Sequence, residues 1–222
     1  MKKNRVVPIA LVAIIAISAI TIEKSISSQI TTRVYEVMPR ATDVTASVPL
    51  FEIPGNIVND SIKSVHIDVG QYQLKNSTFK PSLAIDAKNI SKSTPNLIGS
   101  LDVTATIPAA TIMELTDFSD AQIVGNTLQV SVGSGGLGTA VLVPKYSANQ
   151  IYFELQGISL FGNEIPADSL PAEIKDQIKS KSVRTLSPPQ GMSVKSISLS
   201  SQGLELTMQG KNFRAANLGS TF

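Results

Sequence analysis

Apolar and polar residues alternate over many short stretches of this chain, from about residue 43 almost to its C-terminus. Successive side chains of a strand point to opposite faces, so the alternation predicts strands with one buried and one exposed face. The polar positions hold Ser, Thr, Asn and Gln more often than Lys or Glu, which fits an antiparallel sheet with one face in water. The alternating stretches are residues 64–74, 82–90, 101–107, 126–132, 138–144, 149–161 and 193–213. The last of these has the pattern of a hairpin that turns at Ser-Gln-Gly.

One strand pattern changes into a helix pattern within a few residues, in the stretch LDVTATIPAATIMEL of residues 101–115. Its first half alternates strictly until Pro108 stops the alternation. Apolar residues at helical spacing follow, so we expect a helix over residues 109–118. Both elements are strongly apolar, which raises the question of whether they form only a core or also hold a ligand.

Two further segments have the spacing of amphipathic helices. Residues 23–40 are expected to form a stalk or amphipathic helix. A second helix is expected within residues 167–181, with Asp168 or Ser169 as its N-cap and Pro171 in its first turn. Many strands and few helices together predict an α+β protein that consists mostly of antiparallel sheet. The apolar helix faces consist of Ile26, Ile30, Val34 and Val37 in the first helix and Leu170, Ile174 and Ile178 in the second.

The first 22 residues have the features of an export signal. The basic stretch MKKNR precedes an uncharged apolar run of 17 residues, residues 6–22. The run has only a weak cleavage motif and lies at the lower edge of bilayer-spanning length, so a cleaved signal peptide and an uncleaved anchor both fit. We therefore expect a protein outside the cytoplasm, at the cell envelope, with an α+β domain over residues 41–214 and a flexible tail over residues 215–222.

Composition narrows the classes of function. The chain has 222 residues and no cysteine, which excludes a disulfide framework, a thiol nucleophile, an iron–sulfur cluster and a cysteine zinc site. Its formal charge of +2 owes much to Lys2, Lys3 and Arg5, and beyond residue 22 there are 16 basic residues against 17 acidic ones. A nearly neutral exported part offers no basic stripe for nucleic acid, so a nucleic-acid partner is not expected.

Catalytic motifs are scarce in the sequence. His66 is the only histidine, and alternation places it on the exposed face of a strand together with Asp68. Residues 133–138 have the spacing G-x-G-x-x-G, but a strand pattern follows where a dinucleotide site needs a helix, so we expect a hairpin connection. Asp117 and Asp120 lack the ligand density of a calcium loop. We therefore expect no enzyme activity, no cofactor and no metal site.

Three stretches of the chain carry a family resemblance. They are SVPLFEIPGNIVNDSIKSVHIDV (residues 47–69), GSLDVTATIPAATIMEL (residues 99–115) and PPQGMSVKSISLSSQGLELTMQGKNF (residues 188–213). The first is similar to an opening segment, the second to a strand-to-helix junction, and the third to the C-terminal strands of one family. Together, in this order over roughly residues 40–214, they resemble the LmeA-like phospholipid-binding family of exported bacterial envelope proteins.

This resemblance implies a tubular lipid-binding (TULIP-like) fold, in which a curved antiparallel sheet wraps around a few helices and leaves an apolar cavity for acyl chains. It implies non-catalytic binding of a phospholipid or related lipid at a membrane surface, for carriage, presentation or sensing. A structural envelope protein without a cavity and a lipid- or glycan-processing enzyme remain alternatives, and protein partners remain unknown. Such a cavity needs aliphatic walls. The candidate wall residues are Ile107, Ile112, Met113, Leu115, Phe118, Phe153, Leu155, Leu160, Leu204, Leu206 and Met208.

Overall fold

The structure is a computed structural model of the whole chain. It describes residues 26–49, 61–73, 80–91, 97–115, 118, 120–132, 137–186, 188 and 191–214, without the side chains of residues 26, 37, 113–115, 213 and 214. The expected signal (residues 1–22), the expected tail (residues 215–222) and part of the first family-like stretch lie outside the described residues. Among the described residues, no helix has the length and hydropathy needed to cross a membrane.

The chain divides into two compact units, and both contain parts of the range 41–214 that was expected to form one domain. We call them the β4 unit and the α4 unit, after an element in each. Strand β4 and the hairpin of β11 and β12 contribute residues to both units. The described residues of the β4 unit lie within residues 9–105, 188–195 and 207–222, and those of the α4 unit lie within residues 106–187 and 196–206.

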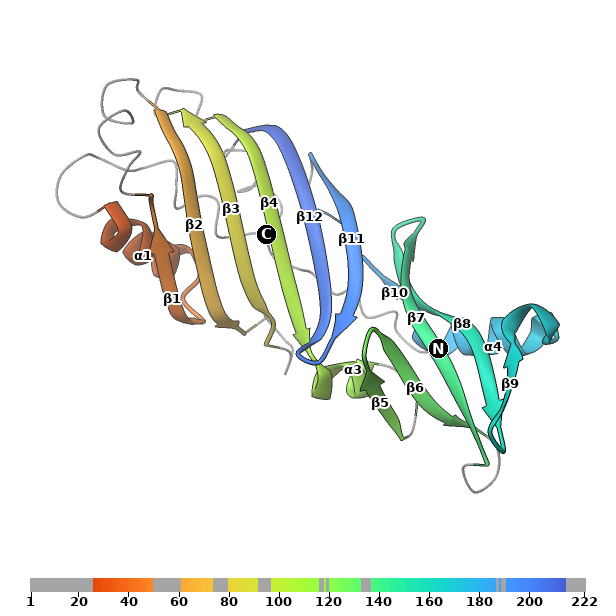
Figure 1. Cartoon of the computed structure of the whole chain (residues 1–222). Coiled ribbons are helices and arrows are strands. Elements are labelled where there is room, and N and C mark those ends of the chain that lie inside the picture. The colour runs from red at the N-terminus through yellow and green to blue at the C-terminus, as the bar shows by residue number, and fades with distance from the viewer. Residues whose placement is uncertain are drawn as a thin grey trace, which may run out of the picture. The chain divides into compact units, whose positions relative to one another are not determined.

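The described residues form two six-stranded sheets, and the first, here the β4 sheet, has the strand order β1-β2-β3-β4-β12-β11. Its strands are long and curved (Figure 1). The register of β2 against β3 is antiparallel and places Ile67 opposite Ile85 and His66 opposite Asp86. The strands are β1 (Ala41–Ser47), β2 (Ser61–Tyr72), β3 (Ser82–Ser91), β4 (Leu97–Pro108), β11 (Met192–Ser200) and β12 (Gly203–Arg214).

One face of the β4 sheet is apolar and buried, as the alternation predicts. Val65, Ile67 and Val69 of β2 are buried, whereas His66 and Asp68 between them lie on the other face. Full burial of a side chain of this size contributes about 1.5–3 kcal/mol relative to exposure, so this face is a major source of stability. The prediction of a mostly antiparallel α+β protein is confirmed.

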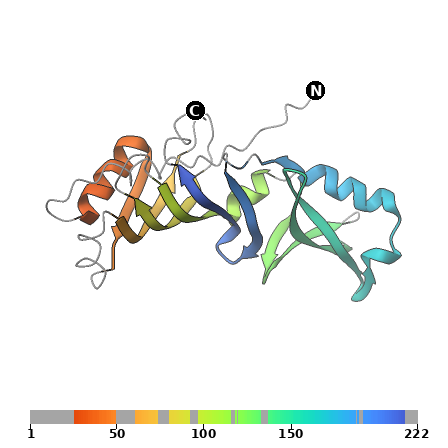
Figure 2. The same ribbon diagram turned by 90° about the horizontal axis from the view of Figure 1, so that it is seen from above.

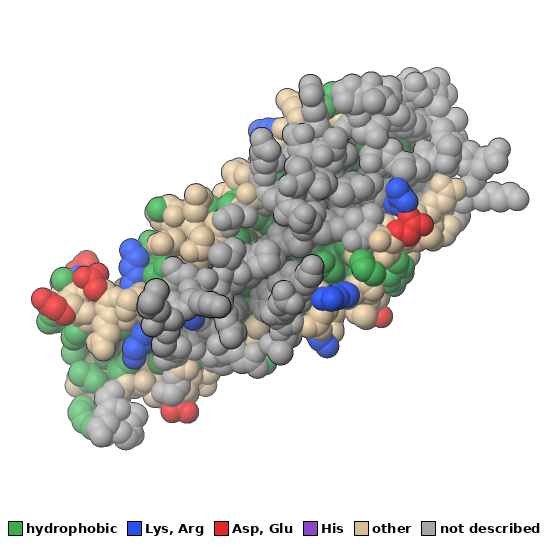
Figure 3. All heavy atoms as spheres, turned by 180° about the vertical axis from the view of Figure 1, so that it is seen from behind, with side chains coloured by type: hydrophobic (Ala, Val, Ile, Leu, Met, Phe, Trp, Pro, Cys, Tyr) green, Lys and Arg blue, Asp and Glu red, His purple; other side chains and the backbone are tan. Residues whose placement is uncertain are grey.

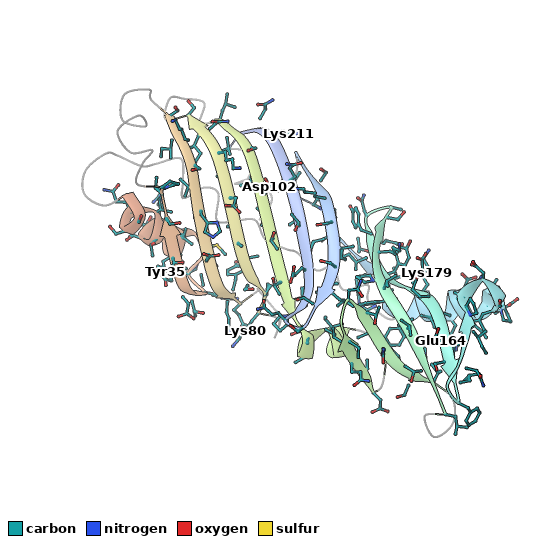
Figure 4. All side chains as sticks on the ribbon, viewed as in Figure 1. Tyr35, Lys80, Asp102, Glu164, Lys179 and Lys211 are labelled. Atoms are coloured by element: carbon teal, nitrogen blue, oxygen red, sulfur yellow. The ribbon has the colours of Figure 1, made fainter. Side chains whose placement is uncertain are left out.

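Helix α1 (Ile26–Val37) packs against β1 and lies within residues 23–40, for which a stalk or amphipathic helix was expected. Ile30 and Val34 lie one turn apart and are completely buried, as is Met38 directly after the helix. Tyr35, next to Val34, is exposed, and its hydroxyl accepts a hydrogen bond of 3.2 Å from the N–H of Val44 in β1 (Figure 4). The helix is therefore held by apolar packing together with a polar contact to the sheet.

The second sheet, here the β7 sheet, has the order β10-β8-β7-β6-β5, and β9 also pairs with β8. Two-residue turns join its hairpins: Ala148-Asn149 between β7 and β8, and Phe161-Gly162 between β8 and β9. All four turn residues have positive φ, as type I′ turns require. The strands are β5 (Ala121–Val124), β6 (Thr127–Val132), β7 (Gly138–Ser147), β8 (Gln150–Leu160), β9 (Asn163–Pro166) and β10 (Arg184–Thr185).

The helical segment expected within residues 167–181 begins at a different residue from the one expected. The 3₁₀-helix η3 (Ala167–Ser169) and helix α4 (Ala172–Ser182) take the place of one helix within residues 167–181. Pro171 is the N-cap of α4, so the assignment of Asp168 or Ser169 as N-cap was wrong. A proline forces the residue before it into extended conformation, and Leu170 accordingly lies outside the helix at ψ 148°.

The junction in residues 101–115 continues from β4 into helix α3 (Ala109–Leu115). The expected extension of this helix to residue 118 falls partly on residues that the structure does not describe. The N–H of Ala109 donates a hydrogen bond of 3.3 Å to the carbonyl of Gln202 in the turn between β11 and β12. Gly203 has φ +143°, and a Cβ there would lie 1.8 Å from the carbonyl oxygen of Ile107. The turn therefore approaches the junction closely enough to require glycine.

Candidate functional site

A cavity of about 340 Å³ lies inside the α4 unit, between α4 and the β7 sheet. Helix α4 packs against β8 and runs along one face of the sheet (Figure 2). Residues from α4, from β6, β7 and β8, and from the segment after α3 line the cavity. They are Phe118, Val130, Ser131, Val132, Ala140, Leu142, Ile158, Ile174, Gln177, Ile178 and Lys181.

The buried residues that line the cavity come from strands. Val130, Ala140 and Leu142 are buried and belong to the neighbouring strands β6 and β7, which the register aligns with Val130 opposite Ala140. Ala140 in turn lies opposite Ile158 of β8. The alternation that predicts these strands therefore also brings apolar residues from three strands to one wall.

Helix α4 supplies both apolar and polar groups to the cavity. Ile174 and Ile178 are four residues apart and share the face that lines it, while Gln177 and Lys181 also line it and are exposed. A cavity with aliphatic walls and an amide and an ammonium group at an exposed side can hold an apolar chain that carries a polar or anionic end.

A side-chain hydrogen bond and a cation–π contact connect the last turns of α4 to β8. The buried hydroxyl of Ser182 accepts a hydrogen bond of 2.9 Å from the N–H of Phe153 and donates one of 3.0 Å to the carbonyl of Lys179. The ammonium of Lys179 lies 4.3 Å from the centre of the Tyr152 ring, within the range of a cation–π contact. These contacts hold the helix above the sheet at the end that carries Lys181 and Ile178.

Of the eleven candidate wall residues, Phe118 lines this cavity. Leu160 is partly buried at the end of β8. The side chains of Met113 and Leu115 lie outside the described residues, so their expected position beside a cavity remains a prediction. The other candidates do not line this cavity and are buried: Ile107, Ile112, Phe153, Leu155, Leu204, Leu206 and Met208.

The other lining residues were not singled out as wall candidates. Ile174 and Ile178 appeared as one apolar helix face, and Val130 and Leu142 lay on alternating strands. Nothing in one sequence shows which helix face leaves space against which strands, because packing that fills space and packing that leaves a cavity use the same aliphatic residues.

A second polar constellation lies on the exposed face of the β4 sheet. Nδ1 of His66 lies 2.8 Å from Oδ1 of Asp86, and Nε2 lies 2.9 Å from Oδ2 of Asp68. The hydrogen bond with Asp86 is the main cause that raises the pKa of His66, and the charges of both carboxylates act in the same direction, while partial burial lowers it. The contact with Asp68 agrees with the alternation, whereas Asp86 was not foreseen because it comes from the paired strand β3.

The two carboxylates favour a protonated His66, and each ring nitrogen already has a carboxylate as its hydrogen-bond partner. Within the described residues, no group of three or more His, Cys, Asp or Glu side chains is placed to hold a metal ion. On the same sheet, Lys195 forms an ion pair of 3.5 Å with Asp102, whose Oδ1 has no closer hydrogen-bond partner (Figure 4). On the face turned to the viewer in Figure 3, the charged side chains of the described residues are scattered rather than gathered in a patch.

Comparisons with protein-family models, with curated proteins and with solved structures each found no match to this chain. The resemblance to the LmeA-like family therefore rests on the three sequence stretches.

Proposed function

We propose that the protein binds a phospholipid or a related membrane lipid without chemical change, and that an acyl chain of this lipid occupies the cavity between α4 and the β7 sheet. The observation that carries the proposal is the cavity itself, whose walls are aliphatic and whose exposed side carries Gln177 and Lys181. The LmeA-like sequence stretches and the apolar run of residues 6–22 support a lipid ligand and a place at the envelope.

The size of the cavity fits part of a lipid. It lies at the lower end of the range for ligand sites, about 300–1,000 Å³, and exceeds the roughly 150 Å³ of an apolar cavity that holds benzene. Burial contributes about 0.8 kcal/mol per methylene group. About ten buried methylenes therefore match the ~8 kcal/mol of micromolar affinity, before the entropy of ordering the chain is subtracted.

Lys181 gives the site a preference for the polar end of the ligand. Lys181 lines the cavity and is exposed, and phosphate is an acceptor that lysine binds as a point charge. A lipid with its chain between α4 and the sheet and its phosphate at Lys181 uses both kinds of lining residue. The finer assignment to a TULIP-like fold belongs to this proposal as well, because it rests on the same family resemblance.

The proposal is tested with a pair of variants on neighbouring residues of β7. Ala140 is buried at the cavity wall, whereas Val141 lies on the opposite face of the same strand. Ala140→Phe fills the cavity, and Val141→Phe adds the same ring outside it. We expect the wild-type chain and Val141→Phe to carry lipid into an organic extract and to take up lipid from vesicles, and Ala140→Phe to lose most of both, as measured by mass spectrometry.

The apolar run of residues 6–22 can bind lipid by itself, and this is why the comparison uses variants that share it. Equal lipid loading of Ala140→Phe and Val141→Phe would contradict the proposal and favour a structural envelope protein. Turnover of lipid that disappears in His66→Ala would favour an enzyme instead.

A further inference from the structure

Phe161 occupies a position that its residue type does not suit. It is the first residue of the two-residue turn between β8 and β9, with φ +52°, and 79% of its surface is exposed. Type I′ turns favour Asn, Asp or Gly at this position, because a bulky residue is disfavoured at positive φ. An exposed aromatic ring in a strained turn is unfavourable for an isolated domain in water. Phe161 is therefore a candidate contact residue for a binding partner.

A second exposed apolar side chain lies at the same end of the β7 sheet. Leu137 is 54% exposed and directly precedes Gly138, which pairs with Leu160, the residue before Phe161. The register therefore brings the two exposed side chains to neighbouring strand ends. We call Leu137 and Phe161 the apolar tip.

The apolar tip is continuous with the wall of the cavity. Gly138 pairs with Val132 on one side and with Leu160 on the other, and a Cβ on Gly138 would lie 2.4 Å from Cδ2 of Leu160 and 3.2 Å from Cγ2 of Val132. Val132 is itself a cavity residue. Absence of a side chain at Gly138 thus lets Leu160 of β8 and the cavity residue Val132 of β6 both approach this position of β7.

The charge that the register places near the tip does not favour an anionic surface as the partner. On the hairpin of β8 and β9, the charged residue closest in register is Glu164, opposite Ser159 (Figure 4). A basic tip would suit an anionic surface, but one acidic residue beside two apolar ones suits contact with hydrocarbon. A stable protein interface buries about 1,200 Å² or more, which two side chains at strand ends do not supply.

We propose that the apolar tip of Leu137 and Phe161 inserts into the interfacial region of a lipid bilayer, and that it places the cavity beside the membrane from which lipid is drawn. This inference rests on the proposed function, because it names the surface that the lipid-binding site meets. Transfer of aromatic and aliphatic side chains from water into the boundary between lipid headgroups and acyl chains is favourable, because it removes their apolar surface from water.

The test uses tryptophan as a reporter, because the chain contains no Trp. Phe161→Trp and Leu137→Trp each place a single Trp at the tip, and Val124→Trp is the matched control. Val124 is also an exposed apolar residue of the β7 sheet, but it lies at the opposite end, beside the turn between β5 and β6. Full-length chains are mixed with phosphatidylcholine vesicles whose acyl chains carry bromine, which quenches nearby Trp fluorescence.

We expect quenching of Phe161→Trp and Leu137→Trp to exceed that of Val124→Trp at least about twofold, with a blue shift in emission, because insertion reaches only about 5–10 Å. Residues 6–22 are the same in all three chains and cannot produce the difference. Addition of salt is expected to leave the quenching unchanged. Equal quenching in all three chains, or none at the tip, would overturn the inference.

Lipid loading distinguishes this failure from failure of the proposed function. Quenching at the tip with equal lipid loading of Ala140→Phe and Val141→Phe would overturn lipid binding in the cavity and support the tip as a membrane contact. Loss of lipid in Ala140→Phe without quenching at the tip would support the cavity and overturn the tip.

Discussion

At the scale of single residues, His66 is held in one orientation by carboxylates from two strands. Asp68 follows it on β2 and Asp86 lies directly opposite on β3, so the ring contacts one carboxylate from each strand. The side chain is 41% exposed, and water therefore screens both ion pairs. The constellation is a surface feature of the sheet, and its contribution to folding is measurable only as a pH dependence.

Because the pKa of His66 is raised in the folded chain, protonation and folding support each other. Their contribution to stability is fully present below the unfolded value of 6.5 and is lost as the pH rises through the folded pKa. For exposed pairs we expect less than about 1 kcal/mol. Proton NMR titration of the single histidine should show a raised pKa that falls in Asp86→Asn and falls less in Asp68→Asn. Identical titration curves for the wild type and Asp86→Asn would contradict this origin.

Gly203 is a residue whose missing side chain is required by its surroundings. A Cβ there would lie 1.8 Å from the carbonyl oxygen of Ile107, and φ is +143°. Gly203→Ala should lower the free energy of unfolding by at least about 2 kcal/mol, measured by urea denaturation. Gly125→Ala is the control, since φ there is +61° and nothing lies within 4 Å of the added carbon. A similar loss in both variants would show that conformation, rather than the close approach, determines the effect.

At the scale of elements, the sequence predicts the longer strands well, but it does not single out β1, β5, β9 and β10, and it predicts helix boundaries less well. Alternation is a local property, so β2, β3, β6, β7, β8 and the final hairpin could all be read from it. The start of α4 was predicted incorrectly, because Pro171 was expected in the first turn of one helix. In the structure Pro171 lies between η3 and α4 as the N-cap of α4. The strand opposite His66 could not be foreseen, since pairing between distant strands is not encoded in the alternation of either.

Helix α4 is expected to depend on a single buried hydroxyl. Ser182→Ala removes the acceptor for the N–H of Phe153 and leaves that donor buried, which costs about 1–3 kcal/mol. Amide hydrogen exchange should become faster in the last turn of α4 and at Phe153. Ser180→Ala is the control, because the exposed hydroxyl of Ser180 bonds only to the carbonyl of Gln177 within the helix. Unchanged exchange in Ser182→Ala would show that apolar packing alone holds the helix.

At the scale of the whole molecule, the two units carry different features. The apolar cavity and the apolar tip belong to the α4 unit, while His66 and its carboxylates belong to the β4 unit. The sequence predicts aliphatic walls but not their location, and the described side chains of the junction that first suggested a ligand, residues 101–112, do not line the cavity. Both sheets show the same alternation, so a single sequence does not reveal that the chain forms two sheets instead of one.

Strand β4 passes from one unit into the other without a linker, because the division falls between Ala105 and Thr106. Insertion of one residue at this point would leave Leu101 and Val103 facing the core. It would turn Ile107 to the opposite, more exposed face of the strand. It would also move Ala109 out of reach of the turn that holds it. An insertion of two residues preserves the faces. Natural variation in the length of this strand should therefore occur in even steps, a constraint that loops elsewhere in the chain do not share.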